Sequence, residues 1–256
     1  KSKLISGWQC GKRLWLEKYQ RDLVEHSAAT EAMFAVGNEV GEIAQALFPE
    51  GVLVEHNFEL DKALLQTEDL LAQAGAVTIF EATFQHEGVL IRADVFIRDE
   101  VGRVRVAEVK SSTQVKEYHE NDCAIQLWVM EGCGIEVDRV ELAHIDNTFI
   151  YPGDGDYNGL LHFADVTDVA RAKQSFVPAL VEEMRAVLDG PEPEIPMGSQ
   201  CTSPFECSFI DYCKGPQTTE LPIEWLGGGR SAVEKYNADD IHDIGDIPEG
   251  YLTNEK

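Results

Sequence analysis

The sequence predicts an α/β fold built around one central sheet. Three segments, at 77–85, 89–98 and 103–110, have the apolar patterns of strands, and only short turns separate them. Such close spacing predicts an antiparallel meander, because parallel neighbours need longer crossover connections. A helical segment at 117–133 and a further strand at 139–145 follow the meander, so strands and helices share one domain.

Apolar residues at helical spacing predict further helices around this strand region. One helix is expected from about Ser2 to Tyr19, one from about Thr30 to Phe48, and one over 61–74. A long helix is expected over 166–189, and the proline-rich segment 191–196 marks a boundary after it. These helices supply the layers that would cover the faces of the sheet.

Composition and charge limit the classes of function. No run of about eighteen apolar residues occurs, so no membrane-spanning helix is expected. The first residues lack the apolar centre of a secretory signal, so a cytoplasmic location is expected. A formal net charge of −25 argues against a strong stand-alone DNA-binding protein, because neutralising phosphates supplies most nonspecific affinity. The charge is compatible with a nuclease domain that works with a partner.

Three charged residues on neighbouring strands form a candidate catalytic group. Glu108 and Lys110 are two positions apart in one strand, so their side chains share a face. Asp94 lies one strand earlier, among apolar neighbours. Two converging carboxylates suit a hard cation such as Mg²⁺ or Mn²⁺, and a nearby lysine can stabilise developing negative charge. The alternative interpretation is a structural ion-pair network.

Other acidic residues are candidates to complete a metal site. Glu81 lies at the start of the first strand of the meander, and its alternative role is that of a surface carboxylate. On the second helix, GNEVGE contains Glu39 and Glu42, and helical geometry puts Glu39 closer to the apolar stripe. The sequence leaves open which of the two faces the site.

Six cysteines suggest a second, structural metal centre. Three of them, Cys201, Cys207 and Cys213, form a C-x5-C-x5-C cluster, which in a cytosolic chain favours metal ligation over disulfides. Cys10 is the natural fourth ligand, because it lies in an amphipathic helix with little other reason to contain a cysteine. The remaining two, Cys123 and Cys133, are expected to be small buried apolar residues.

Together these motifs resemble a known superfamily. In order along the chain they read KLISGWQCGKRLWLEKY, GNEVGEIA, IFEATF, RADVFI, AEVKSS and AIQLWV, followed by the cysteine cluster. They resemble the PD-(D/E)XK nucleases, and most of all a bacterial RecB-like family with the four-cysteine iron–sulfur cluster also found in CRISPR-associated adaptation nucleases. The resemblance implies an αβββαβ core with a mixed central sheet flanked by helices, and a helical iron–sulfur cap. It implies a nuclease domain at 1–218, with its core at about 28–150, and an acidic linker or further domain at 219–256.

The resemblance also implies roles for individual residues. Asp94, Glu108 and the backbone carbonyl of Val109 would bind Mg²⁺ or Mn²⁺, with Glu81 and Glu42 as further candidate ligands. Lys110 would position the attacking water or balance charge, and Gln126 would orient Lys110 or touch the strand that is cut. The implied ligands of a 4Fe–4S cluster are Cys10, Cys201, Cys207 and Cys213. Relatives usually space the last three as C-x2-C-x5-C, so zinc is the alternative metal.

The implied activity is cleavage of DNA phosphodiester bonds by an exonuclease that acts on single-stranded ends. A helicase or a further nuclease-like domain is the implied partner, and no association with a membrane is expected. Two departures from the relatives are visible: Gly41 stands where they carry a histidine, and Met130 where many carry a tyrosine. One alternative is a catalytically weak nucleic-acid-binding or scaffolding module with a structural zinc or iron–sulfur site. Another is a zinc-stapled regulatory protein without a nucleic acid partner.

Overall fold

A computed structural model describes two compact units of the 256-residue chain, Lys1–Ser208 and Phe209–Lys256. The described residues are 1–24, 28–55, 59–215, 221–225, 230–239, 241–248 and 251. Parts of the expected linker at 219–256 therefore lie outside the described residues. The strands and candidate catalytic residues all belong to the first unit.

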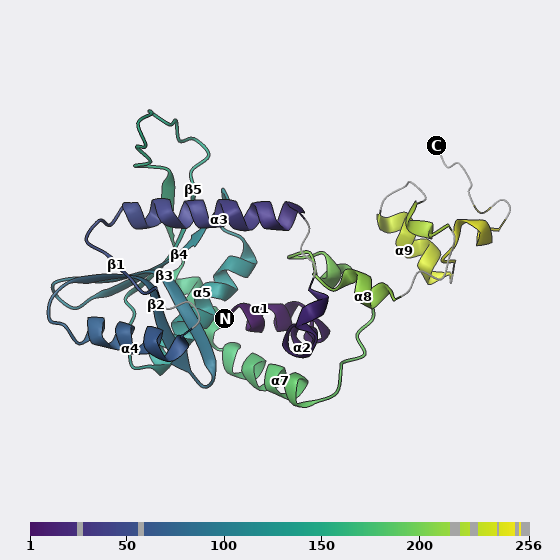
Figure 1. Ribbon diagram of the computed structural model, residues 1–256, viewed down its shortest axis with the longest axis horizontal. Helices are drawn as coiled ribbons and strands as arrows, with labels where there is room; N and C mark the ends of the chain where they lie inside the picture. The colour runs from purple at the N-terminus through teal and green to yellow at the C-terminus, as the bar shows by residue number, and fades with distance from the viewer. Residues whose placement is uncertain are drawn as a thin grey trace. The chain divides into compact units, whose positions relative to one another are not determined.

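The first unit is an α/β fold around a six-stranded mixed sheet with the strands in chain order (Figure 1). The strands are β1 Val52–Leu53, β2 Val77–His86, β3 Val89–Arg98, β4 Val104–Lys110, β5 Arg139–Ile145 and β6 Leu161–Asp165. The meander β2–β3–β4 is antiparallel, as the sequence predicted. β5 runs parallel to β4, with a helix as the crossover between them, and β6 returns antiparallel beside β5.

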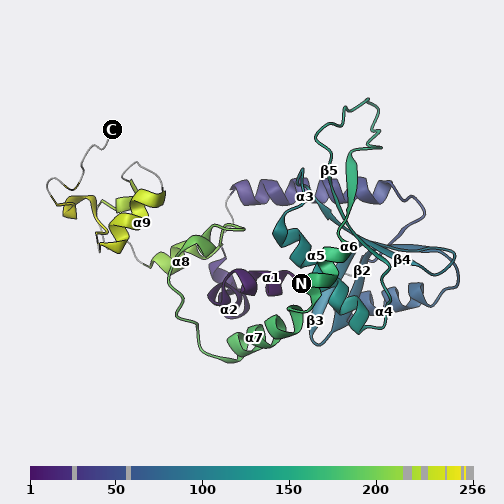
Figure 2. The same cartoon turned by 180° about the vertical axis from the view of Figure 1, so that it is seen from behind.

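Helices cover both faces of this sheet. They are α1 Ser2–Gln9, α2 Gly11–Tyr19, α3 Ala28–Ala46, α4 Leu60–Leu71, α5 Glu117–Gly132, α6 Thr167–Gln174 and α7 Val177–Asp189. Figures 1 and 2 show α3 crossing one side of the sheet, with α4, α5 and α7 on the other. The main core lies between the sheet and the α5 side, where Ile125, Leu127 and Val129 of α5 are fully buried. On the α3 side, Val40 and Ala44 pack against β5 and β6.

Turn residues explain how the sheet is connected. Glu87 and Gly88 join β2 to β3, and both have positive φ angles, 46° and 74°. A two-residue turn with positive φ at both positions matches the twist of the hairpin it connects. Helix α5 ends just before Gly134, whose φ of 81° suits glycine, so the chain reverses there toward β5.

Two of the predicted helices are interrupted. The helix expected over 2–19 is broken at Cys10, which is extended (φ −163°, ψ 117°) and separates α1 from α2. The helix expected over 166–189 is broken before α7, because Pro178 is in its first turn, where proline starts a helix readily. Strand β6 was not predicted; its five residues are too short for a clear apolar pattern.

The sheet is locally distorted where Glu81 of β2 lies opposite Asp94 of β3. Glu81 has φ 57° inside a strand, a conformation that costs roughly 1–3 kcal/mol for a residue other than glycine. Ile79 and Ala82 both belong to the main core. In a regular strand, side chains three positions apart point to opposite faces of the sheet, so the alternation of β2 is interrupted at Glu81. The distortion sets Asp94 outside the regular ladder, beside the end of β4.

Two glycines weaken α3 without an evident packing role. A Cβ added at Gly37 or Gly41 would meet nothing within 4 Å. We therefore expect Gly37→Ala and Gly41→Ala each to raise the free energy of unfolding by about 0.5–1 kcal/mol, because alanine loses less backbone entropy in a helix. Chemical denaturation measures this. Gly7→Ala is the contrasting control, since its Cβ would lie 2.2 Å from Met184 Sδ and should destabilise the protein.

The second unit is small and is described by itself. It contains α8 Ile210–Lys214 and α9 Arg230–Ala238. Ile223, Tyr236 and Ile241 form a buried cluster, which indicates that this segment packs a core of its own.

Candidate functional site

β4 and α5 bring four polar side chains together inside the first unit. Glu108 on β4 is only 3% exposed, and its Oε2 accepts a hydrogen bond from Gln126 Nε2 at 2.5 Å. The other oxygen, Oε1, accepts from Lys110 Nζ at 2.5 Å. Lys110 Nζ also donates to Asp122 Oδ2 at 2.8 Å. Asp122 and Gln126 are one helical turn apart on α5, so both face β4.

Asp94 joins this group from β3. The pairing of Val95 with Ala107 makes Asp94 and Glu108 the next residues in register on the two strands. Asp94 Oδ2 accepts a hydrogen bond from the Val109 backbone N–H at 2.6 Å. The structure thus brings together Asp94, Glu108, Lys110 and Gln126, the four residues that were expected to be catalytic.

Lys1 is a member of the group that the sequence did not indicate. Its Nζ donates to Glu108 Oε1 at 2.8 Å and lies 3.3 Å from Asp122 Oδ1. Two ammonium groups, those of Lys1 and Lys110, therefore lie between the carboxylates of Glu108 and Asp122.

The crowding of charges shifts the pKa values of these groups. Burial, and then the charge of Glu108, raise the pKa of Asp94 to about 8. Burial alone would raise the pKa of Glu108, but Lys1 and Lys110 outweigh it and lower that pKa well below its ordinary value. Burial would lower the pKa of Lys110, but Glu108 and Asp122 raise it well above its ordinary value. Glu108 is therefore charged and Lys110 protonated near neutral pH.

The oxygen atoms of this group are suitable ligands for a hard divalent cation. Carboxylate and carbonyl oxygens from Asp94, Glu108 and Val109 are the ligand types that Mg²⁺ and Mn²⁺ prefer. Burial, and then the charge of Glu108, disfavour the ionised form of Asp94, and a bound cation would favour it. Within the described ranges, no three His, Cys, Asp or Glu side chains are grouped so as to hold a metal ion by themselves. Carbonyl and water oxygens would have to complete the coordination.

The two further candidate ligands lie in different places. Glu81 lies opposite Asp94, and its Oε2 is 4.0 Å from Arg92 Nη1. Burial raises the pKa of Glu81, the charge of Arg92 lowers it, and the charge of Glu108 raises it further. Glu81 is thus at the margin of the group. Glu42 is exposed and lines a hollow with residues 154–158, so the expected role as a ligand is not supported.

The position of Glu42 has a simple cause. Val40 and Ala44, four residues apart, form the buried stripe of α3. Helical periodicity then turns Glu39 and Glu42 toward solvent, and both are exposed. Met130 is fully buried in the core.

Three of the four candidate cluster cysteines lie on segments that are tied together. Cys10 lies between α1 and α2, and the neighbouring Gln9 side chain donates to the carbonyls of Gln200 at 2.6 Å and Phe205 at 2.7 Å. The Cys207 N–H donates to the Cys201 carbonyl at 2.9 Å. The fourth, Cys213, belongs to the second unit, in α8.

The other two cysteines differ from each other. Cys123 is fully buried in the main core, as expected, and burial raises the pKa of its thiol. Cys133 was also expected to be buried, and this is wrong: it is exposed at the end of α5, where its Sγ lies 3.3 Å from the Gln85 carbonyl. The helix ends one residue earlier than the apolar pattern suggested, so Cys133 leaves the core.

A hollow of about 730 Å³ adjoins the charged group. Lys110 and Asp122 form part of its wall, together with residues of α1, α3 and α5 and with Phe205. An extended substrate could therefore reach the charged group from this side.

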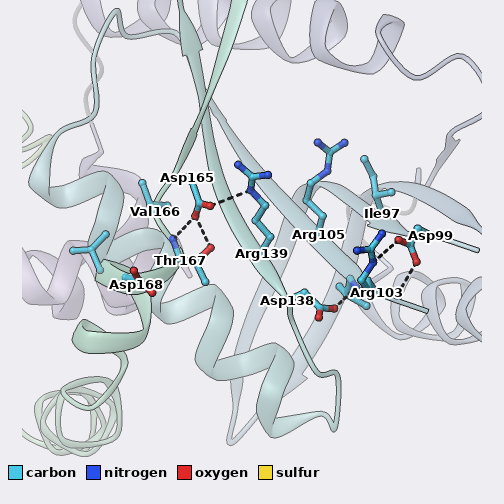
Figure 3. A pocket seen from close by; sticks show the side chains of 12 residues that line it. Ile97, Asp99, Arg103, Arg105, Asp138, Arg139, Asp165, Val166, Thr167 and Asp168 are labelled. Atoms are coloured by element: carbon cyan, nitrogen blue, oxygen red, sulfur yellow. Dashed lines mark hydrogen bonds and ion pairs between the residues drawn. The ribbon is translucent and has the colours of Figure 1, made fainter. Parts of the chain in front are cut away.

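A larger hollow, of about 1090 Å³, lies elsewhere in the unit and is shown in Figure 3. Its arginines are engaged with acids: Arg139 Nε is 3.1 Å from both Glu141 and Asp165, and Arg103 Nε is 2.8 Å from Asp99. Because the positive charges are compensated locally, this hollow has no excess charge to attract an anion.

Comparisons with known proteins add little. No family model matches the chain, and no curated protein is similar to it. Among solved structures, the crystal structure of SSO0001 is similar, with 16% identity over 81% of each chain and a TM-score of 0.35. A likeness this distant carries no argument about activity. None of the helices in the described part of the chain is both long and apolar enough to cross a membrane.

Proposed function

We propose that the first unit is a divalent-metal-dependent nuclease that hydrolyses phosphodiester bonds in DNA. The observation that supports this most is the convergence of Asp94, Glu108, Lys110 and Gln126 from β3, β4 and α5. Apart from β1 and α4, which lie between α3 and β2, the element order α3–β2–β3–β4–α5–β5 is that of the αβββαβ core of the PD-(D/E)XK nucleases that the motifs resemble. We accordingly assign the unit to a RecB-like core.

In this proposal each residue has a distinct task. Asp94, Glu108 and the Val109 carbonyl hold Mg²⁺ or Mn²⁺, and Glu108 is kept in place by the Gln126 amide. When bound, the cation lowers the pKa of a water and stabilises charge on the phosphoryl oxygens. Lys110, which remains protonated, places positive charge beside the reacting phosphate, where negative charge increases in the transition state. Asp122 is a positioning residue, because it accepts the hydrogen bond that directs Lys110.

A cleavage assay with added metal tests the proposal. The chain, purified without oxygen, is incubated with end-labelled DNA oligonucleotides in Mn²⁺, in Mg²⁺ and in EDTA. Cleavage that requires the metal and is lost in an Asp94→Ala/Lys110→Ala double variant supports the nuclease. Full activity in a folded double variant would discard the assignment of these residues.

We also propose that Cys10, Cys201 and Cys207 of the first unit ligate a structural 4Fe–4S cluster, with zinc as the alternative; the fourth ligand expected from the sequence, Cys213, belongs to the second unit. The support is that hydrogen bonds tie the Cys10 segment to the 200–207 segment, which joins the two ends of the first unit. Thiolates are the ligands that both metals share, so metal analysis has to decide between them.

Cys10→Ser is expected to lower the bound iron by more than about half and to reduce the melting temperature, because structural metal binding contributes to folding free energy. Iron and zinc are quantified on anaerobically purified protein. Cys133→Ser is the matched control, since Cys133 is exposed and far from the Cys10 segment in sequence. Equal iron content in the two variants, or zinc alone in the parent, would contradict the iron–sulfur proposal.

A second candidate is a catalytically weak module that binds nucleic acid or acts as a scaffold. The Lys1 ammonium favours it, because Nζ is 2.8 Å from Glu108 Oε1 and so neutralises a carboxylate that would otherwise bind the cation. DNA binding without cleavage in any divalent metal would support this function over the nuclease.

A further inference from the structure

Lys1 places a second ammonium group at the carboxylates of the candidate site. Its Nζ is 2.8 Å from Glu108 Oε1 and 3.3 Å from Asp122 Oδ1. Lys110 Nζ lies 2.5 Å from the same Glu108 oxygen and 2.8 Å from Asp122 Oδ2. Two positive charges therefore balance two negative charges at this point. The Lys1 side chain is 16% exposed and that of Asp122 11%, so little water screens the contacts.

The contacts leave no free oxygen on the Glu108 carboxylate. Oε2 accepts a hydrogen bond from Gln126, and Oε1 accepts from both Lys1 and Lys110. A divalent cation that binds Glu108, as in the proposed nuclease, has to take the place of one of these donors. It also meets the repulsion of the ammonium groups.

Lys1 is the donor that is held least tightly. Its distances to Glu108 and Asp122, 2.8 and 3.3 Å, are both longer than the 2.5 and 2.8 Å of Lys110. Asp122 Oδ1, the oxygen that faces Lys1, is buried and accepts no hydrogen bond from any residue that the structure describes. The contact between Lys1 and Asp122 is therefore an ion pair without a hydrogen bond.

The backbone of Lys1 is fixed, whereas its side chain can move. The Lys1 carbonyl accepts hydrogen bonds from the N–H groups of Leu4 at 2.9 Å and Ile5 at 3.2 Å, at the start of α1. Leu4 belongs to the main core and Ile5 packs against it. The four-carbon stem of a lysine is flexible, so the ammonium can leave Glu108 while α1 stays in place. Asp122 lines the hollow of about 730 Å³, which offers open space beside a present partner of Lys1.

We propose that the Lys1 ammonium and a divalent cation are alternative occupants of the Glu108 carboxylate. Without metal, Lys1 neutralises Glu108 in its buried position. When the cation binds, it takes the place of Lys1 at Glu108, and the Lys1 side chain turns toward the hollow. Lys1 thereby sets how tightly the site holds its metal. This inference rests on the proposed nuclease function, because the cation is the one that Glu108 would bind in that function.

Metal binding, measured without any substrate, tests the exchange. Calorimetric titration at neutral pH gives the Kd for Mn²⁺ of the parent and of Lys1→Met, which keeps an unbranched apolar side chain and removes the charge. The Kd of Lys1→Met is expected to be about 10- to 100-fold lower than that of the parent, because a poorly screened positive charge beside the cation is removed. Lys1→Arg keeps the positive charge and should bind Mn²⁺ as weakly as the parent.

Two further variants are the controls. Lys3→Met removes the same charge from an exposed position on the same helix, and it should leave the Kd for Mn²⁺ unchanged. A Lys1→Met/Glu108→Gln double variant should bind no Mn²⁺, which would locate the tightly bound ion at Glu108. Thermal melting of every variant verifies that it is folded.

The outcomes separate the exchange at Glu108 from the nuclease. Tighter binding of Mn²⁺ by Lys1→Met than by the parent and Lys3→Met supports the exchange, even if the chain cuts no DNA. Equal or weaker binding by Lys1→Met, or no binding of Mn²⁺ by either protein, overturns the exchange. Equal binding with metal-dependent cleavage would leave the nuclease proposal standing without this role for Lys1.

Discussion

Glu108→Gln is expected to lower metal-dependent cleavage by about 1,000-fold or more. Glutamine keeps the shape of the side chain and can still meet Gln126 and Lys110, but it removes the negative charge that attracts the cation. Losses of about 100- to 1,000-fold are typical when one preorganised electrostatic contact is removed, and here the cation would also be lost. Initial rates on labelled single-stranded DNA in Mn²⁺ measure the effect.

Glu141→Gln provides the matched control for this variant. Glu141 is as buried as Glu108, at 2% against 3% exposed, and lies on the adjacent strand, but its partners are Arg105 and Arg139. The control should retain most of the activity at a temperature where it is folded. If the two variants lose activity equally, the effect is a general consequence of removing a buried carboxylate, and Glu108 has no special role.

In EDTA, the stabilising contribution of Asp94 is expected to fall as the pH rises from about 6.5 to about 8. The pKa of Asp94 is raised from 3.8 to about 8 in the folded protein, so the folded state binds this proton more tightly than the unfolded state. Its stabilising contribution is complete below the ordinary pKa and is lost as the pH rises through about 8. Two groups act in the opposite direction. Burial, followed by Lys110 and Lys116, lowers the pKa of His119 to about 4, an effect that ends near pH 6.5, and burial lowers the pKa of the Lys1 amino group to about 6, an effect that ends near pH 8, so the comparison with an Asp94 variant isolates the Asp94 contribution.

Asp94→Asn should remove the pH dependence that Asp94 causes. At pH 8 without metal, the variant is expected to exceed the parent in free energy of unfolding, because asparagine stays neutral where the buried Asp94 carboxyl group begins to ionise. Added Mn²⁺ should stabilise the parent and leave the variant unchanged. Urea unfolding at pH 6.5, 8 and 9 measures both effects. Asp69→Asn, at an exposed position on α4, is the control. If the free energy of unfolding of Asp94→Asn changes with pH as that of the parent does, Asp94 does not cause the pH dependence.

Much of the candidate site could be predicted because strand geometry links residues at short range. Glu108 and Lys110 share a face of β4 by alternation, and the tight meander brings Asp94 beside them. Asp122 was missed although a signal was present: it precedes Gln126 by one helical turn in a buried stretch of α5. Lys1 could not be found, because its position depends on how α1 packs against segments about a hundred residues away.

The errors in the prediction share a physical origin. Cys10 was placed inside a continuous helix, since nothing local to the sequence marks the extended residue that separates α1 from α2. The short edge strand β6 is held by pairing with β5, a contact that its own five residues do not reveal.

The central claim is that Asp94 and Glu108 share one divalent cation. Calorimetric titration of Mn²⁺ into the protein at about pH 7 tests it most directly, in two buffers with different heats of ionisation. We expect one ion bound by the parent with release of a proton, because Asp94 has a pKa of about 8 without metal and must ionise to bind the cation. Binding should be absent in both Asp94→Asn and Glu108→Gln. Failure of the parent to bind Mn²⁺, or equal binding by both variants, would contradict the claim.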